Sequence, residues 1–333
     1  MHKEDQLVER ITRKVPSIPG HRASGVLRLG IGDDSALLSP NGSNDWVLSC
    51  DAFLEGVHFL AKAHPADSVG YKSLVRAASD LVAMGTSPRY FLLTLALPAS
   101  RIGTWLDAFL AGMARAARYL GMRLIGGDTT KSGSISISIT VLGEVSRGQA
   151  LGRSGARPGD LIYVTGKLGR AQLGLELVRS NLARRAGLRD ALRQHLYPRI
   201  PVKLGEWLAR NQAASAMMDI SDGLSTDLTR LCTASRVGAR IEAEGVPCVS
   251  IPAGLFPGRK KINPLQMALH GGDDYGLLIT VPRRRVNKLQ RAPDFSSLTF
   301  VGEITRGRRI LLVDSDGSAA PLDAHGWDPF SRK

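Results

Sequence analysis

The segment VLRLGIGDDSALL (residues 26–38) places a glycine-aspartate turn between two apolar runs, which predicts two short strands joined by that turn. Three other segments also put Asp beside Gly after an apolar run: GGD (126–128), DISDG (219–223) and GGDD (271–274). Ordinary turn chemistry explains any one of them, because Gly supplies positive φ and Asp hydrogen-bonds its own backbone. Four such segments with doubled or closely spaced carboxylates indicate a shared chemical role.

Strands and helices alternate along both halves of the chain. Besides the two strands in 26–38, strands are predicted at 46–48, 91–97, 135–145, 161–165, 216–220, 240–243, 275–281, 298–304 and 310–313. Helices are predicted at 67–84 with Asp67 or Ser68 as the N-cap, at 104–120, after Gly169, and at 184–196, 202–210, 225–234 and 264–269. The segment GGDTT (126–130) is expected to be a phosphate-binding loop.

A polar stretch, residues 146–160, separates the two halves, so we expect one domain over 1–147 and a second over 148–333. Alternating strands and helices without strict βαβ regularity favour an α/β (α+β) fold class. The prediction is two domains, each a mixed β-sheet flanked by helices.

The chain has 333 residues, 43% of them hydrophobic and 22% charged, and a net charge of +14. Such a charge invites a nucleic-acid reading. The basic residues, however, are spread along the sequence, and aromatic residues make up only 5%, too few to interleave with them as base-stacking platforms. A solvated basic surface is the preferred interpretation, no nucleic-acid partner is expected, and a basic nucleic-acid-binding protein stays a remote alternative.

Three cysteines, Cys50, Cys232 and Cys248, form neither a CxxC pair nor an even-numbered framework. The first 15 residues alternate charges and lack the apolar region of a signal peptide, and the longest apolar stretch, 90–99, is far too short for a membrane span. We therefore expect a cytoplasmic protein with no membrane partner.

Several aspartates stand where carboxylates need a partner. Asp219 and Asp222 flank a serine at a strand-to-helix connection, Asp51 closes a strand, and Asp80 lies within a largely apolar helix. If they converge, each pair repels by roughly 1 kcal/mol at ~4 Å even in water. A magnesium ion resolves that repulsion because it takes oxygen ligands and tolerates bridging waters and phosphates. The chain has no GxxxxGK[ST] loop, GxGxxG opening, GxSxG elbow or HExxH helix.

The motifs resemble those of the thiamine-monophosphate kinase family, in order and over nearly the whole chain. The matching segments are GIGDDSALL (30–38), SCDAFLEGVHF (49–59), SLVRAASDLVAMGTSP (73–88), IGGDTTKS (125–132), RSGARPGDLIYVTGKLG (153–169), DISDGLSTDL (219–228), GGDDYGLLIT (271–280) and GWDPF (326–330). That family is similar to the aminoimidazole-ribonucleotide synthetases, selenophosphate synthetases and hydrogenase-maturation proteins.

The resemblance implies transfer of the γ-phosphoryl group of ATP to thiamine monophosphate, the last step of thiamine diphosphate biosynthesis. It implies several Mg²⁺ ions as cofactors, K⁺ as a further candidate, and a homodimer. The N-terminal domain would bind ATP and Mg²⁺ and form the dimer, to which the strand at 135–140 could contribute, and the C-terminal domain would complete the nucleotide and substrate site. No general base is expected, because the acceptor is already an anionic phosphate oxygen.

The resemblance also implies roles for individual residues. The metal ligands would be Asp34, Ser49, Cys50, Asp51, Asp80, Asp128, Asp219 and Asp222; Gly127, Asp128, Arg153 and Ser221 would bind ATP; and His58, Asp273 and Trp327 would line the thiamine pocket. Two positions depart from the family. Cys50 stands where the family usually has Thr, so only its backbone oxygen suits magnesium, and GGDDYG replaces GGEDYE, which makes Asp273 one methylene shorter.

A sibling activity of the same superfamily is the enzymatic alternative. Selenophosphate enzymes carry a reactive Cys or selenocysteine in an N-terminal glycine-rich loop, whereas no Cys precedes Cys50 here. The ribonucleotide synthetases have a DGVGTK-like segment where this chain has DAFLEGVHF (51–59). Both features favour the kinase reading.

Overall fold

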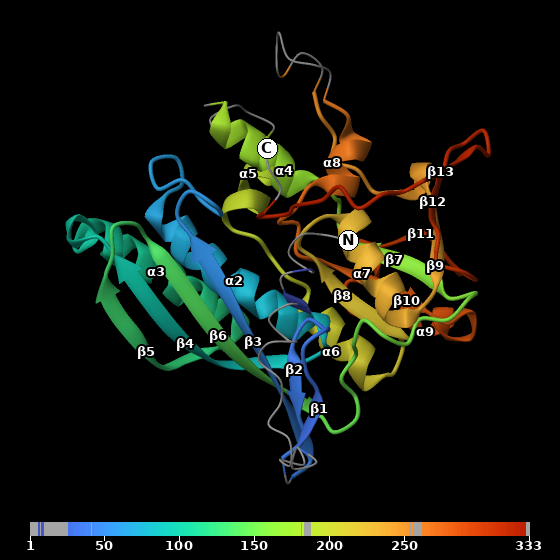
Figure 1. The fold of residues 1–333 in the computed structure, drawn as a ribbon, viewed down its shortest axis with the longest axis horizontal. Coiled ribbons are helices and arrows are strands. Elements are labelled where there is room, and N and C mark those ends of the chain that lie inside the picture. Colours follow the sequence, from blue (N-terminus) through green and yellow to red (C-terminus); the bar gives the residue numbers. More distant parts are fainter. Residues whose placement is uncertain are drawn as a thin grey trace.

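Two β-sheets with helices packed on them form the molecule (Figure 1). The structure, a computed structural model, describes residues 6, 8, 9, 26–40, 42–180, 182, 188–252, 255 and 262–330. The first sheet has the strand order β1-β2-β3-β6-β4-β5 and the second the order β13-β12-β9-β11-β7-β10-β8. The first is built from residues before 147 and the second from residues after 160. The placement of the domain boundary at 147/148 stays a prediction.

The first sheet is mainly antiparallel. Its strands are β1 (Leu27–Leu29), β2 (Ala36–Leu38), β3 (Asn44–Leu54), β4 (Ser87–Leu97), β5 (Arg123–Lys131) and β6 (Ser136–Ser146). In β6, the isoleucines are buried and the serines between them are half-buried, as the alternation predicts. At the far edge, β5 pairs parallel with β4, and all nine of its residues are exposed.

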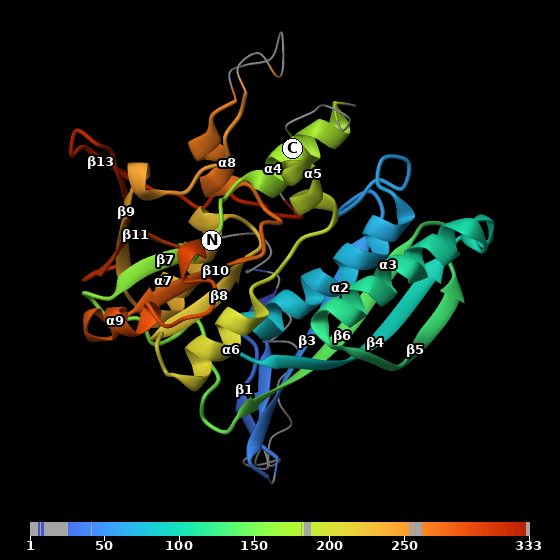
Figure 2. The same ribbon diagram turned by 180° about the vertical axis from the view of Figure 1, so that it is seen from behind.

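Helices α2 (Ala66–Ala83) and α3 (Thr104–Leu120) cover one face of this sheet (Figure 2). Two glycines let them touch backbone to backbone. A Cβ on Gly70 would lie 1.9 Å from the Phe109 carbonyl oxygen, and one on Gly112 would lie 1.8 Å from that of Asp67. Any side chain at either position would therefore push the two helices apart.

The second sheet and its helices account for the rest of the described chain. The strands are β7 (Leu161–Thr165), β8 (Ala216–Ile220), β9 (Gly238–Glu242), β10 (Gly276–Val281), β11 (Leu298–Thr305), β12 (Ile310–Val313) and β13 (Ala319–Pro321). The helices are α4 (Arg170–Arg179), α5 (Arg189–Leu196), α6 (Val202–Arg210), α7 (Leu224–Ser235), α8 (Pro264–His270) and α9 (Val286–Leu289).

Helix α2 lies between the two sheets and belongs to a core that both halves share. Its buried Leu74, Leu81 and Val82 belong to the same apolar cluster as Leu204 of α6 and Leu277 of β10. Burying both sides of α2 explains why its sequence is so apolar. It also means that polar side chains on α2 face groups from both halves.

The fold class predicted from the sequence is confirmed, with a mixed sheet and helices in each half. Three local predictions are wrong. GGDTT (126–130) continues strand β5 because its backbone pairs with β4, the N-cap of α2 is Pro65, and Asp51 lies inside strand β3, which runs on to Leu54, instead of closing it. Helix α9 and strand β13 were not predicted. Residues 184–187 of the predicted helix 184–196 lie outside the described residues. No helix in the described ranges has the length and apolar character to cross a membrane.

Candidate active site

Three carboxylates from distant parts of the sequence meet at one point. Asp34 follows the turn after β1, Asp80 lies near the end of α2, and Asp219 lies in β8. One oxygen of each lies within 4.8 Å of the others. The structure thus brings together three of the predicted metal ligands, because α2 is packed between the two sheets that carry the other two.

The cluster is poor in compensating charge. Burial and then the neighbouring carboxylates raise the pKa of Asp80 well above its usual range, and burial followed by Asp34 raises the pKa of Asp219 to about 7. Two serine hydroxyls donate hydrogen bonds, from Ser49 Oγ to Asp80 Oδ2 and from Ser79 Oγ to Asp219 Oδ2, both at 2.6 Å. Neutral donors do not cancel three negative charges, so the cluster favours a cation or protons.

Arg153 is the cation that contacts this cluster. Its Nε and Nη2 donate to Asp34 Oδ1 at 3.0 and 2.5 Å. The other oxygen, Asp34 Oδ2, is buried with no hydrogen-bond partner in the described part of the chain. A buried carboxylate oxygen without a donor, beside two more carboxylates, fits a hard divalent cation of the Mg²⁺ type.

Strand β3 presents alternate residues to opposite faces of its sheet. Ser49 and Asp51 face α2, where Arg76 Nε donates to Asp51 Oδ2 at 2.7 Å. Cys50 is exposed on the other face, beside Ser138 and Thr140 of β6. Its thiol therefore lies away from the carboxylate cluster, and only its backbone could serve the predicted metal role.

The loop after β8 positions Ser221 and Asp222. Arg230 Nη1 lies 2.5 Å from Asp222 Oδ2. The backbone N–H groups of Ser221, Asp222 and Gly223 all donate to Asp227 Oδ2 at 3.1 Å. Sequence reasoning missed Asp227 and Arg230, although an Asp in the first turn of the following helix was a usable signal.

Gly127 and Asp128 do not join the cluster within one chain. The register runs from Asp51 to Ile139, then to Leu93 and to Gly127, so β5 is three strands away from β3. At ~4.8 Å between strands, that separation is about 14 Å. Asp128 is exposed, and its side chain accepts a local hydrogen bond from the Thr129 N–H.

His58 is a neutral side chain near Arg76 and Asp51. Burial and then the charge of Arg76 lower the pKa of His58 to about 4. Its Nδ1 accepts a hydrogen bond from the Leu54 N–H at 2.9 Å, which leaves the ring proton on Nε2. The ring stacks on Phe53 with 5.6 Å between centroids.

Asp273 is held at both oxygens. Lys72 Nζ donates to Oδ2 at 2.7 Å and Tyr275 Oη donates to Oδ1 at 2.6 Å. Burial opposes ionisation, but the Lys72 ammonium overrides it and holds the pKa of Asp273 well below its usual range. Trp327 is the third predicted residue of the thiamine pocket. Its backbone N–H donates to the carbonyl of Asp222, in the loop after β8, at 2.9 Å.

Sequence reasoning also missed Lys72, Arg76 and Tyr275. The signal for the first two was their spacing, since Lys72, Arg76 and Asp80 stand four residues apart on α2 and so share one face of the helix. Lys72 also lies 3.5 Å from His195 Nδ1, and His195 lies 2.9 Å from His64, so the network continues into the protein.

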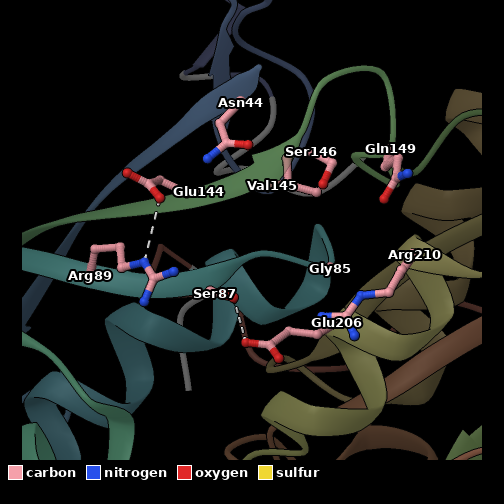
Figure 3. A pocket seen from close by; sticks show the side chains of 10 residues that line it. All are labelled: Asn44, Gly85, Ser87, Arg89, Glu144, Val145, Ser146, Gln149, Glu206 and Arg210. Atoms are coloured by element: carbon pink, nitrogen blue, oxygen red, sulfur yellow. Dashed lines mark hydrogen bonds and ion pairs between the residues drawn. The ribbon is translucent and has the colours of Figure 1, made fainter. Parts of the chain in front are cut away.

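A cavity of about 180 Å³ lies between the two halves but is separate from the cluster (Figure 3). The lining residue nearest in sequence to the cluster is Gly85, five residues after Asp80. Its charged side chains are partly paired, with Arg89 3.5 Å from Glu144 and Ser87 donating to Glu206 at 2.6 Å. This cavity shares no residue with the predicted site.

Known proteins match this chain over most of its length. The family described as AIR synthase related protein matches residues 32–145 with its N-terminal domain and 157–314 with its C-terminal domain. The thiamine-monophosphate kinase of Escherichia coli (strain K12) is 37% identical over 310 residues, which cover 92% of this chain and 93% of that protein. The chain belongs to the thiamine-monophosphate kinase family.

Solved structures agree with this assignment. The structure of AaThiL complexed with AMPPCP and TMP superposes with a TM-score of 0.83 at 31% identity, covering 98% of this chain and 97% of that one. The thiamine-monophosphate kinase from Stenotrophomonas maltophilia K279a has a TM-score of 0.72 at 35% identity, covering 94% and 96%. Members of this kinase family thus share both the sequence and the fold of this chain.

Proposed function

We propose that this protein transfers the γ-phosphoryl group of ATP to the phosphate of thiamine monophosphate and releases thiamine diphosphate and ADP. The observation that carries the proposal is the convergence of Asp34, Asp80 and Asp219 in a chain of this family. AaThiL, which has the same fold, was solved with AMPPCP, an ATP analogue, and with TMP. The reaction would complete thiamine diphosphate biosynthesis.

The residues suit a transfer between two polyanions. Asp34, Asp80 and Asp219 would hold Mg²⁺, with Ser49, the Cys50 backbone, Asp51 and Asp222 as further ligands; bound there, the ions neutralise phosphate charge. Arg153 and the backbone of Ser221 would bind ATP phosphates. K⁺ stays a candidate further cofactor. No side chain needs to remove a proton, since the acceptor oxygen is already anionic.

The opposite end of the site suits the thiamine ring system. The neutral His58 offers an N–H at Nε2, Asp273 offers a carboxylate near a cationic heteroaromatic ring, and Trp327 offers an aromatic face. Lys72 and Tyr275 keep Asp273 ionised and in place.

The purified protein with Mg²⁺, ATP and thiamine monophosphate should form thiamine diphosphate and ADP in equal amounts. Chromatographic quantification of both products checks this result. Replacement of thiamine monophosphate by free thiamine, as the control, should stop ADP release, because the acceptor phosphate is missing. ATP binding without any thiamine diphosphate would contradict the proposed function.

We further propose that the protein works as a homodimer in the cytoplasm. The exposed strand β5 carries Leu124 and Ile125 at 50% and 52% exposure, and Tyr90 and Leu92 of β4 are also exposed. An exposed apolar edge strand is a ready surface for a second copy. Asp128, which is remote from its own cluster, would then complete the site of the other subunit. The three free cysteines suit a reducing compartment.

Mixing two inactive variants should restore activity if Asp128 acts across the dimer. Asp80→Asn and Asp128→Asn would each inactivate both sites, but a mixed dimer has one site with both aspartates intact. Random exchange should recover about one quarter of wild-type turnover. A mixture of Asp80→Asn and Asp219→Asn, which belong to one cluster, is the matched control and should stay inactive. Equal inactivity of both mixtures would place Asp128 in the site of its own chain.

A further inference from the structure

We propose that Arg76 binds the phosphate group of the acceptor substrate. This inference rests on the proposed function and adds a substrate-binding residue to it. Arg76 lies on α2, between the carboxylate cluster and the groups expected to hold the thiamine ring.

Lys72, Arg76 and Asp80 follow one another along one face of α2, so the parts of the site that they contact lie in a row. Consecutive members are about 6 Å apart along the axis, at ~1.5 Å rise per residue. Lys72 contacts Asp273 at the thiamine end, and Asp80 belongs to the metal cluster at the other end. A substrate with its ring at the thiamine end and its phosphate directed toward the metal cluster would place that phosphate beside Arg76.

The guanidinium of Arg76 is only partly engaged. Nε donates to Asp51 Oδ2 at 2.7 Å, whereas Nη2 reaches Asp51 Oδ1 only at 3.5 Å, so the fork is not closed on the carboxylate. The group lies 5.9 Å from the centre of the Phe53 ring, which supports its plane. The Arg76 side chain is 23% exposed, against 3% for Lys72, so a ligand can reach it.

The other nearby groups are less able to take this role. Lys72 is buried against Asp273, Arg153 contacts the metal cluster through Asp34 and is proposed to bind ATP, and His58 is neutral. Asp51 and the cluster are negative and would repel a phosphate in the absence of cations. A planar guanidinium with free donors is the side chain that binds a phosphate in two-pronged geometry.

The alternative is that Arg76 only neutralises Asp51. In that case its removal would leave the Asp51 carboxylate unpaired, which would change Mg²⁺ binding, weaken the fold and affect both substrates alike. A phosphate-binding role instead predicts a defect confined to the acceptor. The two roles therefore differ in which ligand is affected.

The test compares wild type, Arg76→Gln, Arg76→Lys and the control Arg115→Gln. Arg115 lies on α3, outside the site, and its replacement removes an ion pair with Asp67 of α2. We expect Arg76→Gln to raise KM for thiamine monophosphate at least tenfold and to weaken its binding equally by calorimetry with AMPPCP and Mg²⁺. KM for ATP and the Mg²⁺ concentration for half-saturation should stay within twofold. Arg76→Lys should be intermediate, because it keeps the charge but not the fork, and Arg115→Gln should match wild type.

A KM for thiamine monophosphate within twofold of wild type in Arg76→Gln would overturn the proposal. Equal losses for Mg²⁺, ATP and thiamine monophosphate would also overturn it, in favour of the neutralising role. If Arg76→Gln fails to fold, Arg76→Lys gives the same comparison. A wild-type protein that makes no thiamine diphosphate would refute the proposed function itself, which is a separate outcome.

Discussion

Asp80→Asn should abolish phosphoryl transfer and yet stabilise the metal-free protein. The substitution removes one oxygen ligand, so turnover should fall by several orders of magnitude. It also removes one of three crowded carboxyl groups while keeping an acceptor for the Ser49 hydroxyl. In EDTA at pH 8, we expect the free energy of unfolding to rise by roughly 1–3 kcal/mol. Urea unfolding and the product assay measure the two effects.

The stabilisation should depend on pH in a defined direction. The pKa of Asp219 is raised from its ordinary value of 3.8 to about 7 in the folded protein, so the native state holds an extra proton between those values. The stability that this proton provides is lost as pH rises from about 4 to 7. The gain from Asp80→Asn should therefore shrink at pH 5. The surface variant Asp107→Asn is the control. A metal-free Asp80→Asn protein less stable than wild type at pH 8 would contradict the repulsion argument.

Arg153→Gln should have the opposite effect on stability. The Asp34 side chain is fully buried and its Oδ1 depends on Arg153, whose side chain is 20% exposed. Removing the cation leaves a buried charge, at an expected cost of about 2–4 kcal/mol in the metal-free protein. Mg²⁺ should recover much of that loss, because it supplies charge to the same carboxylate. KM for ATP should rise by at least tenfold, since Arg153 is the proposed phosphate clamp.

Unfolding with and without Mg²⁺, together with ATP kinetics, checks the Arg153 prediction. Arg240→Gln is the matched control, because it breaks an exposed ion pair with Glu242 and should cost less than about 0.5 kcal/mol. Wild-type stability in Arg153→Gln would contradict the stabilising role assigned to the Arg153–Asp34 ion pair.

The carboxylate cluster was predictable because its signals are local. An Asp in an apolar helix, such as Asp80, and an Asp at the end of a buried strand, such as Asp219, each require a partner, and a shared cation would supply one. Strand β7 and the start of α6 were predictable for a similar reason, since Gly159 and Gly166 lie at the two ends of β7 and Pro201 precedes α6.

Features that depend on pairing across the chain were not predictable. GGDTT forms a strand because β4 offers it a parallel partner, and Gly127 lets the two backbones approach: a Cβ there would lie 1.8 Å from the Leu93 carbonyl oxygen. Lys72 finds Asp273 at a separation of 201 residues, which no local pattern encodes. The remoteness of Asp128 from its own cluster likewise follows from strand order, not from motif spacing.

The close approach of Gly70 to the Phe109 backbone, and of Gly112 to the Asp67 backbone, fixes how the site can adjust. With no side chains between the two backbones, α2 cannot slide along α3 without a steric clash. The spacing of Lys72, Arg76 and Asp80 along α2 is therefore fixed. Changes in ligand size must be taken up by the turn that carries Asp34 and by the loop that carries Asp222. One residue inserted into α2 between Lys72 and Asp80 would rotate the side chains that follow it by about 100° about the helix axis. The two ends of the site would then no longer share one face of the helix.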